Sequence, residues 1–123
     1  FNVIENICIP AFIKKTPKNI AKSKANQLMD YLGISNRSQN KPNELSGGEK
    51  QRVAVARALI NEPSIILADE PSGNLDSNAS NNLHELFLSL RKDFNYTFII
   101  ATHNMLLAKK SDRVLEIKDG KIK

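Results

Sequence analysis

Two adjacent carboxylates, Asp69 and Glu70, directly follow the apolar run Ile65-Ile66-Leu67-Ala68. Carboxylate oxygens are good ligands for Mg²⁺, and a positioned carboxylate can accept a proton from water. We therefore take Asp69 as a candidate metal ligand and Glu70 as a candidate base for an attacking water. Considered alone, the pair has a simpler explanation, namely that it marks the polar exit from a strand.

A second chemical signal lies at Leu45-Ser46-Gly47-Gly48-Glu49. Ser46 and Glu49 have the spacing of a capping box, which predicts that a helix begins there and runs to about residue 60. Gly47 and Gly48 leave its first turn without side chains, so free N–H groups at a positive helix end can approach an anion such as phosphate. An ordinary capped helix is the alternative, although two glycines cost it roughly 1 kcal/mol each.

The elements around Asp69 and Glu70 form a β–α–β pattern. Strands are expected at 64–68 and 96–101, separated by a helix that Asp76 or Ser77 caps. Such a crossover is right-handed and leaves its strands parallel, so both strands end at one edge of the sheet. His103 follows the second strand and should therefore converge with the two carboxylates, at the edge where open α/β sheets bind ligands. His84 lies inside the intervening helix, and we assign it no role.

The sequence before residue 62 predicts helices. One starts after Asn2 and should be kinked or ended by Pro10. Another starts at Thr16-Pro17, with threonine as the N-cap, and stops at Gly33. Residues 34–45 form a polar loop before the Ser46 helix. We divide the chain into a helical part, 1–61, and an α/β part, 62–123, which ends in a short helix at 104–110, a strand at 113–117 and a hairpin return.

Composition limits the chain to one domain. Its 123 residues are 41% hydrophobic, and the single cysteine excludes an internal disulfide. No apolar run approaches the roughly 20 residues of a membrane span. The net charge of +5 comes from scattered lysines. A solvated surface is therefore the favoured interpretation, and nucleic acid is not an expected partner.

Four motifs in order resemble those of ATP-binding cassette (ABC) ATPases. Leu45–Glu49 with Gln51-Arg52 resembles the signature motif, and Ile65–Glu70 resembles the Walker B strand. Ser72–Asp76 resembles the D-loop, and His103 occupies the position of the switch histidine. The resemblance implies an α/β fold that is part of a P-loop NTPase: the helical signature subdomain plus the C-terminal half of the parallel core sheet.

The resemblance also implies roles. Two cassettes meet head to tail in this family, so Ser46, Gly47 and Gly48, with Glu49 and Gln51, would bind ATP in trans. Further roles fall to the second half of the chain: Asp69 for Mg²⁺, Glu70 as the base, His103 for the γ-phosphate, and Asp76 at the interface between cassettes. The expected partners are a second cassette and integral membrane permease subunits, which would place the protein in the cytoplasm, peripheral to the inner face of the cell membrane.

Two family motifs are missing. No Gly-x-x-x-x-Gly-Lys-Ser/Thr occurs among the five glycines, and the glutamine loop is also absent. We therefore expect this chain to be the C-terminal part of a longer cassette and to be inactive as an ATPase alone. The run Leu67–Asp76, with Glu5-Asn6-Ile7, most resembles the lipoprotein-releasing and macrolide-export branch. An ABC ATPase that acts on nucleic acid or ribosomes, and a catalytically inert docking module, remain the alternatives.

Overall fold

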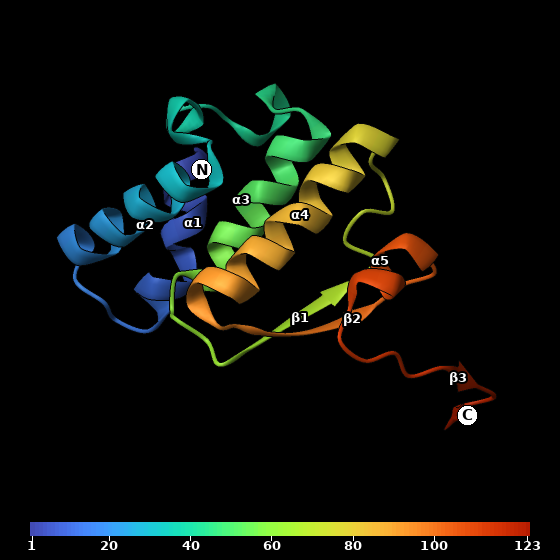
Figure 1. Ribbon diagram of the computed structural model, residues 1–123. Helices are drawn as coiled ribbons and strands as arrows, with labels where there is room; N and C mark the ends of the chain where they lie inside the picture. The colour runs from blue at the N-terminus through green and yellow to red at the C-terminus, as the bar shows by residue number, and fades with distance from the viewer.

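The computed structural model describes residues 1–123 as a helical layer over a two-stranded parallel sheet, followed by a small hairpin (Figure 1). The helices are α1 (Val3–Ile13), α2 (Lys18–Leu32), α3 (Gly47–Leu59), α4 (Ser77–Phe94) and α5 (Met105–Lys110), with single 3-10 turns at Ser35–Arg37 and Pro42–Glu44. The strands are β1 (Ile65–Asp69), β2 (Thr97–Ala101), β3 (Ile117–Lys118) and β4 (Lys121–Ile122). None of the helices has the length and hydropathy needed to span a bilayer.

The start of the chain departs from the sequence prediction in two places. Pro10 does not end α1, which continues to Ile13 because its buried face, including Ile7 and Ala11, packs against α2 and α3. Thr16 does not cap α2. Its N–H instead donates to the Ala11 carbonyl at 2.9 Å and closes the end of α1, so Pro17 takes the N-cap position. The predicted stop at Gly33 is confirmed by its left-handed φ of 71°.

The largest group of buried side chains lies between α1, α2 and α3. Ile7, Met29, Leu32 and Leu59 are each at most 1% exposed. The same core continues under α4 through Leu90, which is fully buried. Burying such side chains is worth roughly 1.5–3 kcal/mol each. The helical part therefore has a closed apolar interior.

The two strands of the sheet pair in parallel, as predicted, with Ile65 opposite Thr97 and Asp69 opposite Ala101. Helices α3 and α4 lie over one face of this sheet, and no helix covers the other (Figure 1). On the open face Ile65, Leu67 and Ile99 are 53%, 75% and 57% exposed. A wholly apolar strand such as Ile65–Ala68 is typical of a parallel sheet covered on both faces, but in this structure one face is open.

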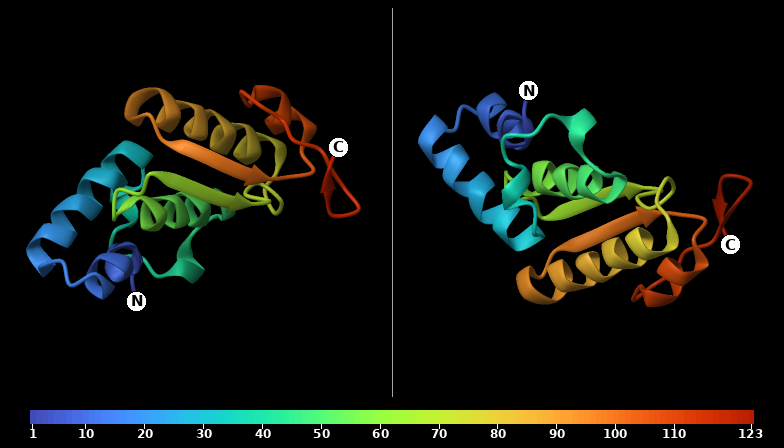
Figure 2. Two further views of the ribbon diagram at one scale, coloured as in Figure 1. Left: turned by 90° about the horizontal axis from the view of Figure 1, so that it is seen from below. Right: turned by 90° about the horizontal axis from the view of Figure 1, so that it is seen from above.

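The end of the chain is less regular than predicted. Only Ile117–Lys118 forms strand β3, paired with β4, and residues 113–116 are not a strand. Strands need a neighbour for their backbone hydrogen bonds, and a two-residue β4 supplies too few. The predicted hairpin itself is confirmed. Figure 2 shows it at the end of the molecule opposite to α1 and α2.

Tyr31 joins the helical part to the α/β part. Its hydroxyl donates to the Asp93 carboxylate at 2.8 Å, and its ring meets Phe94 edge-on, with 5.0 Å between the ring centres. Phe94 in turn packs on Tyr96, just before β2. Burial and the neighbouring Asp93 raise the pKa of Tyr31 to about 12.

Candidate functional site

Glu70 is held at the carboxyl edge of the sheet by the end of the neighbouring strand. Its carboxylate accepts hydrogen bonds from the His103 backbone N–H at 2.7 Å and from the Thr102 hydroxyl at 3.2 Å. Its own N–H donates to Ala101 O at 2.8 Å. The β–α–β pattern thus brings Glu70 and His103 together as predicted, and the structure adds Thr102, which the sequence analysis did not single out.

The His103 ring and the Asp69 side chain are the solvent-exposed groups at this edge of the sheet. The ring is fully exposed, with Nε2 3.6 Å from the Glu70 carboxylate. Asp69 ends β1 with an exposed side chain. No three acidic, cysteine or histidine side chains gather as a ready metal cage. A lone carboxylate still fits Mg²⁺, because that ion commonly takes one or two carboxylates and completes its shell with phosphate and water.

Glu70 itself has a strained backbone, with φ at +44°. Non-glycine residues in this region are uncommon and cluster at functional sites. The strain belongs to the tight loop 70–76, in which Gly73 N–H donates back to Glu70 O at 3.1 Å. A Cβ on Gly73 would lie 3.3 Å from that oxygen, so glycine suits the position.

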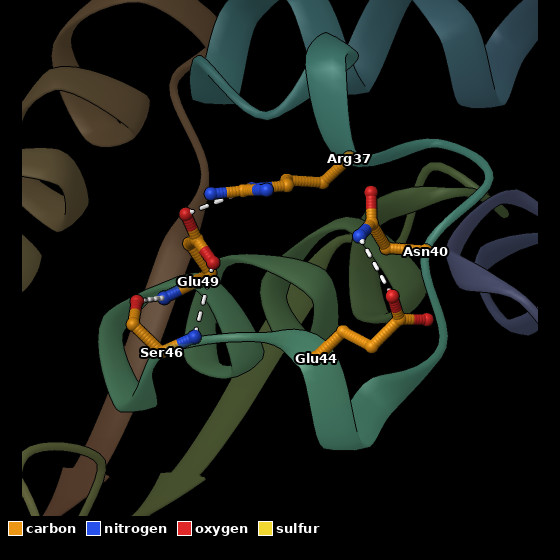
Figure 3. Close-up of polar contacts among 5 residues, drawn as sticks. All are labelled: Arg37, Asn40, Glu44, Ser46 and Glu49. Carbon is orange, nitrogen blue, oxygen red and sulfur yellow. Dashed lines mark hydrogen bonds and ion pairs between the residues drawn. The ribbon is translucent and has the colours of Figure 1, made fainter.

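The start of α3 is organised around Glu49 (Figure 3). Ser46 N–H donates to the Glu49 carboxylate at 3.0 Å, and Glu49 N–H donates to Ser46 Oγ at 3.2 Å, which is the predicted capping box. Arg37 Nε donates to the same carboxylate at 3.1 Å. The Ser46 N–H and then Arg37 hold the pKa of the Glu49 carboxyl below its usual range. Glu49 therefore acts as a cap within this chain.

The exposed side of this helix start remains available to a ligand. Ser46 Oγ only accepts in the capping box, so its proton is free to be donated. The first N–H groups of a helix have no carbonyl four residues back. Ser46 and Gly47 are exposed, Gly48 is partly exposed, and Gln51 lies half-buried one turn further along.

The structure gives Gly47 a role that the sequence analysis did not foresee. A Cβ on Gly47 would lie 3.2 Å from Leu75 Cδ2, whereas one on Gly48 would lie 3.8 Å from Ala79 Cβ, an ordinary contact. The missing side chain at Gly47 therefore lets the start of α3 pack closely on loop 70–76. Asp76, at the end of that loop, caps α4 as predicted and accepts from Ala79 N–H at 2.8 Å.

His84, to which the sequence analysis gave no role, is 1% exposed and lies beneath the same loop. Its Nε2 is 3.0 Å from Ser72 Oγ, which is buried as well. The signal that could have found it is its place on the buried face, one residue after Leu83.

Comparison with known proteins gives a consistent family. A model of the family described as ABC transporter matches residues 2–73. The "Lipoprotein-releasing system ATP-binding protein LolD" of Bacteroides fragilis (strain YCH46) is 55% identical over 122 residues, which are 99% of this chain and 56% of that protein. The protein of the same name from Cytophaga hutchinsonii is 52% identical over 122 residues, also 99% of this chain and 56% of its own length.

Solved structures agree in fold. The dimeric structure of MJ0796, a bacterial ABC transporter cassette, superposes with a TM-score of 0.83 at 33% identity, over 99% of this chain and 54% of that one. The post-hydrolysis dimer of MJ0796 bound to ADP and Pi gives 0.83 at 32% identity, with the same coverage. The chain thus spans about half the length of the relatives that it matches. On the family match, the relatives and the α/β architecture together, the chain belongs to the ABC transporter family of ATP-binding cassettes.

Proposed function

We propose that this chain forms part of the ATP-hydrolysing subunit of an ABC exporter that releases lipoproteins. The support comes from family membership and from relatives at 55% and 52% identity that carry the name lipoprotein-releasing system ATP-binding protein. In this proposal the subunit works in the cytoplasm, docked on integral membrane permease subunits at the inner face of the cell membrane.

The observation that carries the proposal is the held carboxylate of Glu70. Thr102 and the His103 N–H fix both of its oxygens at the carboxyl edge of the sheet. An ionised carboxylate has about four acceptor positions, so these two bonds leave room for a water. Glu70 accepts a proton from that water as the water oxygen bonds to the γ-phosphorus and the bond from that phosphorus to ADP breaks. The exposed His103 ring contacts the γ-phosphate.

The start of α3 serves a second ATP. Ser46 donates its free hydroxyl proton, and Gly47 and Gly48 offer N–H groups, to the γ-phosphate of ATP held by another cassette. Gln51 lies behind them, and Asp76 faces the partner beside them. Asp69 would hold Mg²⁺, which when bound neutralises phosphate charge. Because the chain has no phosphate-cradling loop of its own, it hydrolyses no ATP alone.

The test replaces Glu70 by glutamine in the full-length protein, which keeps the size of the side chain and removes the base. General-base catalysis typically contributes 10²–10⁴-fold, so ATP turnover should fall by at least about 10²-fold while ATP affinity stays near wild type. Glu116→Gln is the matched control, since Glu116 is exposed and lies in the C-terminal segment before β3. Turnover of Glu70→Gln within a few-fold of wild type would remove Glu70 from the mechanism.

A further inference from the structure

The chain buries three polar side chains, and all three lie in one place. Ser72, Ser80 and His84 are 7%, 9% and 1% exposed. Ser72 belongs to loop 70–76, and Ser80 and His84 are four residues apart on α4, on the face that meets the loop. Buried polar groups cost free energy unless they bond to one another, so a cluster of them has to be explained.

The contacts within this cluster all run from α4 to the loop. His84 Nε2 lies 3.0 Å from Ser72 Oγ. Ser80 Oγ lies 3.4 Å from both Ser72 O and Leu75 O, at the long limit of a hydrogen bond. The His84 contact is therefore the shortest polar contact within this cluster.

His84 also carries the one buried side-chain polar atom that has no partner, Nδ1. An orphaned N–H is rarer in proteins than an orphaned acceptor, so the favoured tautomer places the proton on Nε2, which donates to Ser72. A leucine here would fill the space without any unpaired atom. The buried histidine therefore costs free energy of folding, and its bond to Ser72 offsets that cost.

Ser72 belongs to the loop that begins at Glu70. Glu70 has a φ of +44°, and Gly73 N–H and Leu75 N–H close the loop on Glu70 O and Ser72 O at 3.1 and 3.2 Å. Strained backbone persists only when its surroundings hold it in place. Ser72 is two residues from Glu70, and His84 fixes Ser72 from below.

We propose that His84 is a positioning residue. Through Ser72 it holds loop 70–76 in the conformation that directs the Glu70 carboxylate towards the attacking water. The catalytic part of this inference rests on the proposed function of Glu70, whereas the structural part, that His84 sets the loop, does not.

The charges around His84 favour a neutral ring. Burial and then Lys110 on α5 lower the pKa of His84, while Glu85 on α4 acts in the opposite direction. Lys110 and Glu85 pair with each other at 2.7 Å. The bond to Ser72 is therefore one between neutral groups.

The experiment compares His84→Leu, His84→Gln, Ser72→Ala and the double variant His84→Leu/Ser72→Ala in the full-length protein. Losing one neutral hydrogen bond should lower kcat for ATP about three- to tenfold with KM near wild type. The double variant should lose no more than the worse single one, because both changes remove the same contact. Glutamine, whose terminal amide can occupy the place of Nε2, should recover kcat to within about twofold.

Hydrogen exchange of the peptide that spans residues 70–76 tests the structural part without ATP turnover. Exchange there should accelerate in His84→Leu and Ser72→Ala. It should not accelerate in Leu90→Val, which destabilises the buried face of α4 six residues further along. Loop exchange at the wild-type rate in His84→Leu, or equal acceleration in Leu90→Val, would overturn the inference. Accelerated exchange together with an active Glu70→Gln protein would instead refute only the proposed role of Glu70.

Discussion

The helical part and the α/β part of this chain differ in how completely they are packed. Residues 1–61 supply most of one closed core, which α4 completes, and Ile7, Leu32 and Leu59 in it are at most 1% exposed. The sheet of the second part is covered on one face only, and Leu67 on the other face is 75% exposed. The candidate catalytic residues Glu70 and His103 lie in this less complete part. The start of α3 lies in the more completely packed part, where Ser46, Glu49 and Arg37 hold one another.

The largest expected effect comes from replacing one leucine in each part, which tests this difference in packing. Leu32→Ala leaves a cavity in a closed core and should lower the free energy of unfolding of residues 1–123 by about 2–5 kcal/mol. Leu67→Ala removes a side chain already in water, so the change should stay within about 0.5 kcal/mol. Chemical denaturation followed by circular dichroism measures both. Similar losses for the two variants would mean that the open face is covered in solution.

Much of this arrangement is predictable from the sequence. Ser46 with Glu49, Gly33 and Asp76 mark helix ends by local hydrogen bonding and backbone geometry alone, and each of these ends is confirmed. The parallel pairing of β1 and β2 follows from the handedness of the crossover. Local sequence signals do not predict helix ends correctly where tertiary packing outweighs them. Pro10 stays within α1 because the helix is held by its neighbours.

Two features of the candidate site could not be predicted from the sequence, because they too depend on tertiary packing. Gly47 accommodates Leu75, and His84 supports Ser72, and both contacts join segments that lie apart in the sequence. A single sequence contains no signal for such pairs. The glycines at 47 and 48 look equivalent in the sequence, and only the structure shows that one is packed tightly and the other is not.

The glycine pair gives the next largest effect. Alanine at either position gains roughly 1 kcal/mol of helix propensity. At Gly47 the new methyl would crowd Leu75 at 3.2 Å, so overpacking should cancel that gain, and Gly47→Ala should be less stable than Gly48→Ala by about 1–2 kcal/mol. Thermal unfolding of the two variants side by side measures the difference. If Gly47→Ala proved the more stable, α3 would not pack against loop 70–76 as described.

Tyr31, which links the two parts, gives the smallest effect. Tyr31→Phe keeps the ring against Phe94 and removes the bond to Asp93, at a cost of about 0.5–1.5 kcal/mol. Folding raises the pKa of Tyr31 from 10.0 to about 12, so this stabilisation is complete below pH 10 and is lost as the pH rises towards 12. Tyr96, the other tyrosine, also has a pKa raised by burial and then by Glu62, so the titration of Tyr31 is read from the difference in phenolate absorbance between wild type and Tyr31→Phe. That difference should grow only as the pH rises towards 12. A Tyr31 that titrates near pH 10 would mean that the link is open in solution.

The most direct test of ATP binding in trans asks whether the two parts of one chain contact two different ATP molecules. Full-length Gly48→Asp places a negative charge where phosphate should bind, at a position where a Cβ makes only an ordinary contact, and Glu70→Gln removes the base. Each variant alone should be inactive. In an equal mixture about half of the dimers combine the two variants, and each of these has one site with an intact Gly48 from one chain and an intact Glu70 from the other. If ATP is bound in trans, mixing restores ATP turnover, up to about a quarter of wild type when the sites act independently. A mixture no more active than the separate variants would contradict binding in trans.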